Sequence, residues 1–193
     1  MELPGQTQQT DLRRFVRTYP HALDDTLIAD LTALEGGYRS DVDWRRCFIT
    51  PVSGEALDRF RAVVGTCFAD YRQLSRTLGS CTLIEEPIVI RYDAATSDRP
   101  DWFHEHVDAW SVPSASRQVS VVAYLNDVAE GGETEFGPLG YTQRCEKGTI
   151  LIPSNFLFEH VALPPRSGPK NVAVSWLHFG NDGTPAKPVT PLY

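Results

Sequence analysis

Two residues in the middle of the chain, His106 and Asp108, are of types that bind transition metals. They stand two positions apart, so in an extended strand their side chains point to the same face. His160 is the candidate third ligand, because the apolar segment around it would place it on another strand. Two imidazoles and one carboxylate form the facial triad of non-haem Fe(II) sites, which leaves three coordination positions for cosubstrate and oxygen. The sequence therefore predicts a mononuclear iron site.

Lys170, at the start of the last apolar segment, is the second residue that points to chemistry. In a strand it shares one face with Trp176, and it can enter the same interior as His160. A cation buried in such an interior needs an anionic partner. A dicarboxylate cosubstrate would supply that anion.

A different metal site stays open because His104 has the same strand parity as His106. Together these two histidines would form the His-x-His pair of a cupin. The glutamate that a cupin needs a few residues later is absent, since residues 109–112 read Ala-Trp-Ser-Val. We therefore expect His104 beside the metal site or in a loop, and we expect His21 and His178 to be structural.

Two helices are predicted ahead of these residues. The first covers 24–35, with Asp24 or Asp25 as its N-cap and two glycines after its end. The second runs from the cap residue Ser53 to about residue 74, with an apolar stripe at helical spacing. The residues between them, 37–50, are expected to form a loop that could include one strand.

From about residue 81 the apolar residues alternate with a period of two, which is typical of strands. Short apolar segments separated by Gly, Pro and Asp predict roughly eight strands and therefore a sandwich or jelly roll. The prolines after residue 180 exclude the tail from a sheet interior. The predicted strands are 82–92, 103–107, 117–125, 133–136, 141–146, 148–152, 156–162 and 171–179.

Helices followed by strands favour a mainly β fold, with helices packed on one face of a β-sandwich within a single domain, 1–193. Residues 1–80 are expected to form a mostly helical support region. Residues 81–180 would form the β core that carries the site, and 181–193 a Pro-rich tail.

Composition restricts the possible classes of function. The chain has 193 residues, 41% hydrophobic and 22% charged, which fits one globular domain, and its net charge of −7 argues against a nucleic-acid partner. No apolar run approaches the ~20 residues of a membrane span and no export signal opens the chain, so we expect a cytoplasmic protein. The sequence predicts no oligomeric state.

Four scattered cysteines without a CxxC pattern exclude a zinc ribbon and are expected to be free and buried: Cys47, Cys67, Cys81 and Cys145.

Residues 88–179 resemble the catalytic core of the Fe(II)/2-oxoglutarate-dependent oxygenases, in particular the prolyl 4-hydroxylase-like branch. The resemblance rests on many short segments that agree in order and spacing. It implies a double-stranded β-helix (jelly-roll) fold, with His106, Asp108 and His160 as iron ligands. The matching segments are Arg91-Tyr92, His106-Val107-Asp108, Arg117, residues 122–126, residues 131–136, Lys147-Gly148, His160, Lys170 and Trp176.

The same resemblance implies the remaining parts of an active site. Lys170 would pair with the distal carboxylate of 2-oxoglutarate, Tyr92 and Tyr124 would line that cosubstrate, and Trp176 would lie beside the metal pocket. Arg117 is either a substrate anchor or an ordinary strand-edge salt bridge. The implied cofactors are Fe(II), 2-oxoglutarate and O2, with ascorbate as a candidate stimulant.

The implied reaction is hydroxylation of an unactivated C–H bond, with a prolyl residue of a peptide or protein as the first candidate substrate. A free amino acid or another small molecule is the alternative, and so is a non-catalytic jelly-roll protein that senses or binds metal. Trp102 and Trp110 are candidate substrate contacts, and residues 37–50 and 93–103 could form a lid. The stretch between Tyr92 and His106 lacks the glycine-containing turn usual in the family, so the substrate is the least transferable property.

Overall fold

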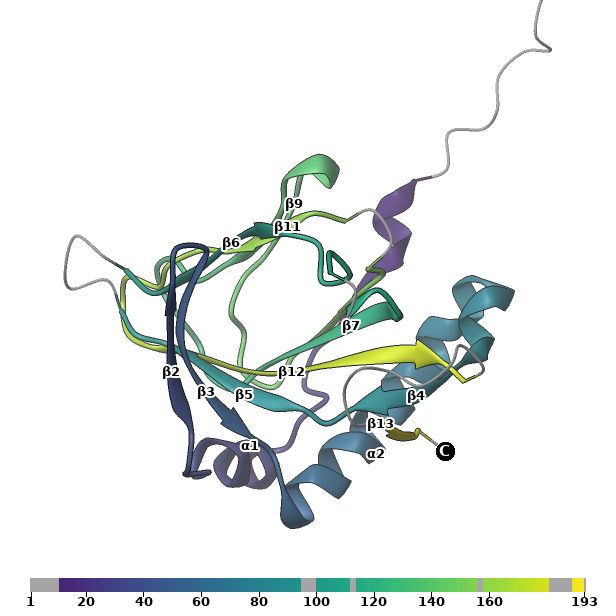
Figure 1. The fold of residues 1–193 in the computed structure, drawn as a ribbon, viewed down its shortest axis with the longest axis horizontal. Helices are drawn as coiled ribbons and strands as arrows, with labels where there is room; N and C mark the ends of the chain where they lie inside the picture. Colours follow the sequence, from purple (N-terminus) through teal and green to yellow (C-terminus); the bar gives the residue numbers. More distant parts are fainter. Residues whose placement is uncertain (1–10, 95–99, 112–113, 156–157, 181–188, 193) are drawn as a thin grey trace, which may run out of the picture.

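The computed structural model describes residues 11–94, 100–111, 114–155, 158–180 and 189–192. Within these residues the strands form one curled sheet with antiparallel pairing, and helices α1 and α2 lie against one side of it (Figure 1). The mainly β, jelly-roll class expected from the sequence is confirmed, with the helices on one face.

The elements have the following bounds. The helices are α1 (Asp25–Thr32) and α2 (Gly54–Tyr71), with short 3-10 turns at Leu12–Phe15, Arg72–Leu74, Arg76–Ser80 and Gly137–Leu139. The strands are β1 (Val16–Tyr19), β2 (Tyr38–Val42), β3 (Arg45–Pro51), β4 (Cys81–Glu85), β5 (Ile88–Tyr92), β6 (Trp102–His106), β7 (Arg117–Tyr124), β8 (Thr134–Phe136), β9 (Tyr141–Gln143), β10 (Ile150–Pro153), β11 (His160–Ala162), β12 (Lys170–Phe179) and β13 (Val189–Pro191).

Both predicted helices form, with differences at their ends. Asp24 caps α1, since its side chain accepts a hydrogen bond of 2.7 Å from the Leu27 amide. The helix ends at Thr32 rather than at Glu35. Ser53 stands at the cap position of α2 but makes no capping hydrogen bond there, because the chain enters the helix through left-handed Gly54 (φ 65°).

Residues 37–50, expected to form a loop that could include one strand, instead contain two strands. These residues form the hairpin β2–β3, whose register runs from Tyr38 opposite Ile49 to Val42 opposite Arg45. β3 then pairs with both β5 and β6, so the hairpin belongs to the main sheet. Its many charged residues hide the period of two from sequence inspection. With β1, which pairs with β10, the first 80 residues add three strands to what was expected to be mostly helical support.

Two further strand boundaries differ from expectation. The predicted strand 82–92 is broken into β4 and β5 at Pro87, which has no amide hydrogen to donate to a ladder. The tail contributes a strand after all, since β13 pairs with β4 and places Pro191 opposite Leu83. β13 has β4 as its partner strand, so this proline lies on an edge strand, where proline is tolerated.

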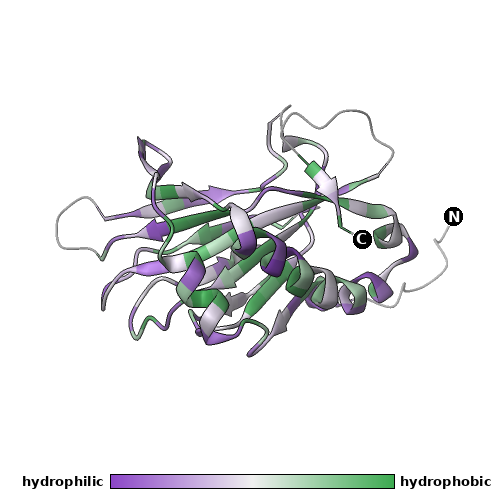
Figure 2. Ribbon diagram, turned by 90° about the horizontal axis from the view of Figure 1, so that it is seen from below, coloured by the Kyte–Doolittle hydropathy of each residue, from purple (hydrophilic) through white to green (hydrophobic). Residues whose placement is uncertain are grey.

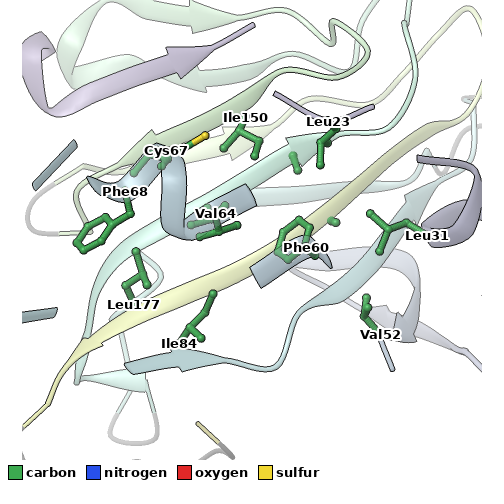
Figure 3. Packing of buried hydrophobic residues seen from close by; sticks show 14 of the residues in the cluster. Leu23, Leu31, Val52, Phe60, Val64, Cys67, Phe68, Ile84, Ile150 and Leu177 are labelled. Atoms are coloured by element: carbon green, nitrogen blue, oxygen red, sulfur yellow. The ribbon is translucent and has the colours of Figure 1, made fainter. Parts of the chain in front are cut away.

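Two apolar cores organise the molecule. One lies between the helices and the sheet, where Phe60, Val64 and Phe68 of α2 are fully buried against the strands (Figure 3). The other fills the interior of the curled sheet and includes Tyr92 and Tyr124. Figure 2 shows apolar stretches along the interior strands and polar stretches on outlying loops and helix faces.

The four cysteines are free and buried, as predicted. Among the described residues, no helix combines the length and the apolar character needed to cross a membrane.

The packing of α2 on the sheet can be tested at Phe60. Truncation to alanine removes a fully buried ring, and a cavity of that size costs about 3–5 kcal/mol of unfolding free energy. Urea denaturation of Phe60→Ala measures this loss. Asp58→Ala, on the exposed side of the same helix, is the control and should change stability by less than about 0.5 kcal/mol. Equal effects in the two variants would contradict the packing described here.

Candidate metal centre and cosubstrate pocket

Three neighbouring segments bring His106, Asp108 and His160 together. His106 ends β6, Asp108 lies in the turn after it, and His160 begins β11, where it pairs directly with His106 in the antiparallel register. One ligand atom from each residue lies within 4.8 Å of the other two. Nε2 of His106 lies 3.3 Å from Oδ1 of Asp108, and Nε2 of His160 lies 3.8 Å from Oδ2 of the same residue. The three predicted ligands therefore converge on one point.

The backbone orients both imidazoles. Nδ1 of His106 lies 2.7 Å from the carbonyl oxygen of His104, and Nδ1 of His160 lies 3.2 Å from that of Phe158. A carbonyl can only accept, so in both rings Nδ1 carries the hydrogen and Nε2 keeps its lone pair for a metal. The ring of Phe103 stacks on His106 at 3.6 Å between centroids and further fixes its plane.

The charges of the site also favour metal binding. Burial alone would raise the pKa of Asp108, but its contacts with His106 and His160 and the hydrogen bond from Ser120 together lower the pKa below its usual value. Burial lowers the pKa of His160, against the opposing pull of Asp108. The ligands are thus held as a carboxylate and a neutral imidazole, the forms that bind a metal.

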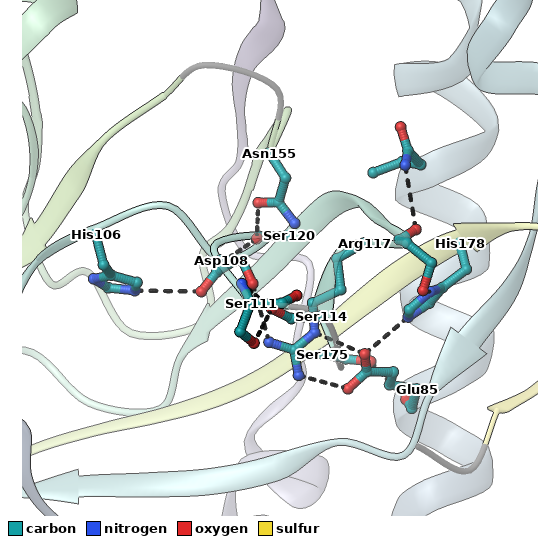
Figure 4. A network of polar contacts seen from close by, with 12 residues as sticks. Glu85, His106, Asp108, Ser111, Ser114, Arg117, Ser120, Asn155, Ser175 and His178 are labelled. Carbon is teal, nitrogen blue, oxygen red and sulfur yellow. Dashed lines mark hydrogen bonds and ion pairs between the residues drawn. The ribbon is translucent and has the colours of Figure 1, made fainter. Parts of the chain in front are cut away.

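Arg117 forms a buried ion pair. Its Nε and Nη2 donate to the two carboxylate oxygens of Glu85 at 2.7 and 2.8 Å (Figure 4). The guanidinium also lies 3.5 Å above the ring of Trp176, and Nη1 is 3.4 Å from the Asp108 carbonyl oxygen. His178, expected to be structural, closes the same network with Nε2 2.8 Å from Glu85. For Arg117 the salt-bridge alternative therefore describes the geometry better than a substrate anchor.

Lys170 lies fully inside the barrel, in the same cavity as the three ligands. Its ammonium is 5.4 Å from the ring centroid of Tyr92 and 5.8 Å from that of Tyr124. No carboxylate lies within 4 Å of it in the described part of the chain. Burial lowers the pKa of Lys170, although Cys145 and Glu133 raise it. A buried cation with no anion of the protein beside it can hold the carboxylate of a ligand.

Thr134 is a residue of this pocket that the sequence analysis did not single out. Its hydroxyl accepts a hydrogen bond of 2.8 Å from Tyr124, and its side chain lines the cavity beside Lys170. The available signal was the parity of β8, on which the buried Thr134 and Phe136 alternate with the half-buried Glu135. The other predicted cosubstrate residues, Tyr92 and Trp176, also line this cavity.

Two outer cavities reach the metal ligands from outside the barrel. One, of about 470 Å3, is bordered by His106, and the other, of about 290 Å3, is bordered by Asp108. Three aromatic side chains line both cavities: Trp44, Phe103 and Trp110. We call these three the aromatic wall. Trp44 lies 5.5 Å from Phe103 and 5.9 Å from Trp110 between ring centroids.

The structure separates the two predicted substrate tryptophans. Trp110 is 65% exposed and belongs to the aromatic wall. Trp102 packs against the ring of His104 at 5.2 Å and is not among the described residues that line either outer cavity. Trp44 was covered only by the broader expectation for 37–50. In the other expected lid, 93–103, residues 95–99 lie outside the described residues, as do 156 and 157 before His160.

His104 contributes a backbone carbonyl and not a metal ligand. Its ring is exposed and lines the larger outer cavity, while the ligand group contains His106, Asp108 and His160. The cupin interpretation of a His104–His106 pair is therefore not supported by the geometry.

Comparison with solved structures shows that this fold is shared with prolyl hydroxylases. A Pseudomonas putida prolyl-4-hydroxylase has a TM-score of 0.66 at 20% identity, covering 86% of this chain and 92% of its own. A viral collagen prolyl hydroxylase from Paramecium bursaria Chlorella virus-1, solved with 2-oxoglutarate, has a TM-score of 0.60 at 19% identity. This match covers 86% of the present chain and 96% of the viral protein. A prolyl hydroxylase from Trichoplax adhaerens, solved with a hypoxia-inducible-factor peptide, has a TM-score of 0.66 at 12% identity. This match covers 86% of the present chain and 84% of the Trichoplax protein.

Comparison by sequence gives the family. No curated protein matches the chain significantly. Residues 89–178, which carry all three ligands and Lys170, match the family model of the 2OG-Fe(II) oxygenase superfamily. The donor set fits that family, because two imidazoles with free Nε2 atoms and one carboxylate suit Fe(II), and Lys170 suits a dicarboxylate. The catalytic core at residues 89–178 is therefore similar to the 2OG-Fe(II) oxygenase superfamily, and this similarity, together with the fold shared with prolyl hydroxylases, supports a dioxygenase.

Proposed function

We propose that this dioxygenase hydroxylates a prolyl residue of a peptide or protein. Fe(II) would be held by His106, Asp108 and His160, and 2-oxoglutarate by Lys170. The observation that carries the proposal is the shared cavity, in which a buried ammonium without a carboxylate partner faces the same interior as the three ligands.

The protein contributes binding, orientation and exclusion of water. When bound, iron and 2-oxoglutarate supply the oxidising chemistry, in which O2 is consumed, 2-oxoglutarate becomes succinate and CO2, and one oxygen atom enters a C–H bond. Lys170 neutralises the distal carboxylate, and Thr134 and Tyr124 add hydroxyl groups at the same end. Apolar side chains between the two ends, Val172 and Val174, keep the pocket dry.

The aromatic wall supports a peptide substrate. Proline-rich segments bind in grooves lined by aromatic rings, because the preformed polyproline II conformation loses little entropy there. The wall borders both outer cavities, and these touch His106 on one side and Asp108 on the other. An extended chain could lie across the wall and place one residue at the iron. A free amino acid would need a smaller, closed pocket.

The iron site can be tested by removing a ligand. His106→Ala or Asp108→Ala should abolish the slow conversion of 2-oxoglutarate to succinate that occurs without substrate, because two ligands do not hold the metal. Succinate formation and anaerobic Fe(II) titration measure the loss. His104→Ala is the matched control and should bind iron normally, since its backbone carbonyl remains. Undiminished turnover in either ligand variant would contradict the site. Repeating the wild-type assay with ascorbate checks the expected stimulation.

The cosubstrate assignment can be tested at Lys170. Lys170→Met keeps the length of the side chain and removes its charge. A hydrogen bond to a charged group contributes about 1.5–3 kcal/mol, so the apparent KM for 2-oxoglutarate should rise roughly 10- to 150-fold. Iron affinity measured without cosubstrate should be unaffected. Lys147→Met, whose partner is the exposed Asp25, is the control. An unchanged KM in Lys170→Met would place the carboxylate elsewhere.

The substrate proposal can be tested on the aromatic wall. Trp44→Ala and Trp110→Ala should each raise KM for proline-containing peptides about tenfold, while the succinate formed without peptide stays constant. Aromatic side chains that a bound peptide covers contribute most of its affinity. A gain of one oxygen atom in the peptide mass measures turnover. Trp102→Ala is the control. Oxidation of free amino acids together with no oxidation of any peptide would favour the small-molecule alternative.

A further inference from the structure

Ser120 lies between two side chains that compete for its single hydrogen. Its hydroxyl is within hydrogen-bond distance of an Asp108 carboxylate oxygen, Oδ2, and of the side-chain amide of Asn155 (Figure 4). All three side chains are buried. A serine hydroxyl can donate one hydrogen bond and accept others. In the structure the amide oxygen of Asn155, Oδ1, faces Ser120, so the single hydroxyl hydrogen serves either Asp108 or Asn155 and the other contact joins two acceptors.

Asn155 resolves this conflict when its amide is turned. With the oxygen toward Ser120, Nδ2 of Asn155 is buried and makes no hydrogen bond within the described residues. With Nδ2 toward Ser120, Asn155 donates to the hydroxyl and the hydroxyl donates to Asp108, so both contacts become hydrogen bonds. In this orientation the amide oxygen, instead of Nδ2, is the atom without a hydrogen bond. A buried acceptor without a partner is tolerated better than a buried N–H donor without one.

We propose that Asn155 and Ser120 form a donor chain that positions Asp108 for iron binding. Oδ1 of Asp108 lies 3.3 Å from Nε2 of His106, and Oδ2 lies 3.8 Å from Nε2 of His160. Because the hydroxyl of Ser120 occupies Oδ2, Oδ1 is left as the ligand atom. A carboxylate held in this way binds through one oxygen. The other coordination positions then stay open for cosubstrate and oxygen.

The donor chain also ties the ligand-bearing segments to one strand. Ser120 is on β7, opposite Trp176 of β12. Asn155 follows β10 and begins the segment that leads to His160, and its backbone amide donates to the carbonyl of Gln118 on β7 at 2.9 Å. The turn that carries Asp108 and the segment that carries His160 therefore meet at the same point of β7. Ser120 and Asn155 are positioning residues, because both act on the metal through Asp108.

Metal affinity tests this inference directly, and the inference rests on the iron site proposed above. Ser120→Ala should weaken anaerobic binding of Fe(II) or of the spectroscopic probe Co(II) about 10- to 100-fold, as expected when the hydrogen-bond partner of a ligand is lost. The visible spectrum of bound Co(II) should also change, because the carboxylate can then bind through both oxygens. Ser120→Thr keeps the hydroxyl and should restore both properties.

A matched control separates this effect from the general cost of losing a buried hydroxyl. Ser175 is fully buried on β12, where its hydroxyl donates to the Glu85 carbonyl at 2.7 Å, away from the ligands. Ser175→Ala should bind Co(II) with wild-type affinity and spectrum. Wild-type affinity and spectrum in Ser120→Ala would overturn the donor chain. Asp108→Ala distinguishes the two proposals, since normal binding in that variant would overturn the iron site itself.

The direction of the chain is tested at Asn155. If Asn155 donates to Ser120, Asn155→Ala should weaken Co(II) binding by a few fold, because Ser120 keeps its hydrogen bond to Asp108 but loses the donor that orients it. If Ser120 instead donates to Asn155, the same variant frees the hydroxyl for Asp108 and tightens Co(II) binding. Tighter or unchanged binding would overturn the proposed direction.

Discussion

The buried ammonium of Lys170 is the constraint on which the rest of the pocket depends. A charge held inside a barrel without a counter-ion costs several kcal/mol, and the sheet tolerates it because β12 is paired on both sides, with β5 and β7. Two tyrosine rings give the cation partial compensation. A dianionic ligand would neutralise the remaining charge of Lys170 and would bind only the folded state of the protein. Its binding free energy would therefore add to the stability of the fold. If Lys170 holds the cosubstrate as proposed, cosubstrate binding would therefore be coupled to folding.

The ligands and the strands around them were predictable because they follow local rules. His106 and Asp108 share a face by strand parity, and the alternation of apolar residues after position 81 gave most of the strands. Lys170 could be placed in the interior by the same parity. The parts that lie far apart in sequence were harder. The hairpin β2–β3 is held by pairing with β5 and β6, and its own residues, rich in charge, do not show that pairing.

Other parts of the site leave no signal in the sequence. The carbonyls that orient His106 and His160 belong to His104 and Phe158, and any residue type could supply them. The role of Arg117 depended on Glu85, which lies 32 positions away and reaches it only through the sheet. Thr134 and Trp44 became recognisable once the cavities were in place. Long-range geometry, rather than residue type, decides these roles.

The tip of the β2–β3 hairpin has an evolutionary consequence. Trp44 lies in the two-residue turn between Val42 and Arg45, while the proposed iron ligands are carried by β6, the turn after it and β11. Under the proposed function, a mutation at this tip would change the aromatic wall directly and would reach His106 only through Phe103, on which Trp44 packs. Substrate choice could therefore change with little effect on the oxidative chemistry. In the laboratory, the same separation makes the hairpin tip a place to diversify when a new substrate is sought for an unchanged catalytic core.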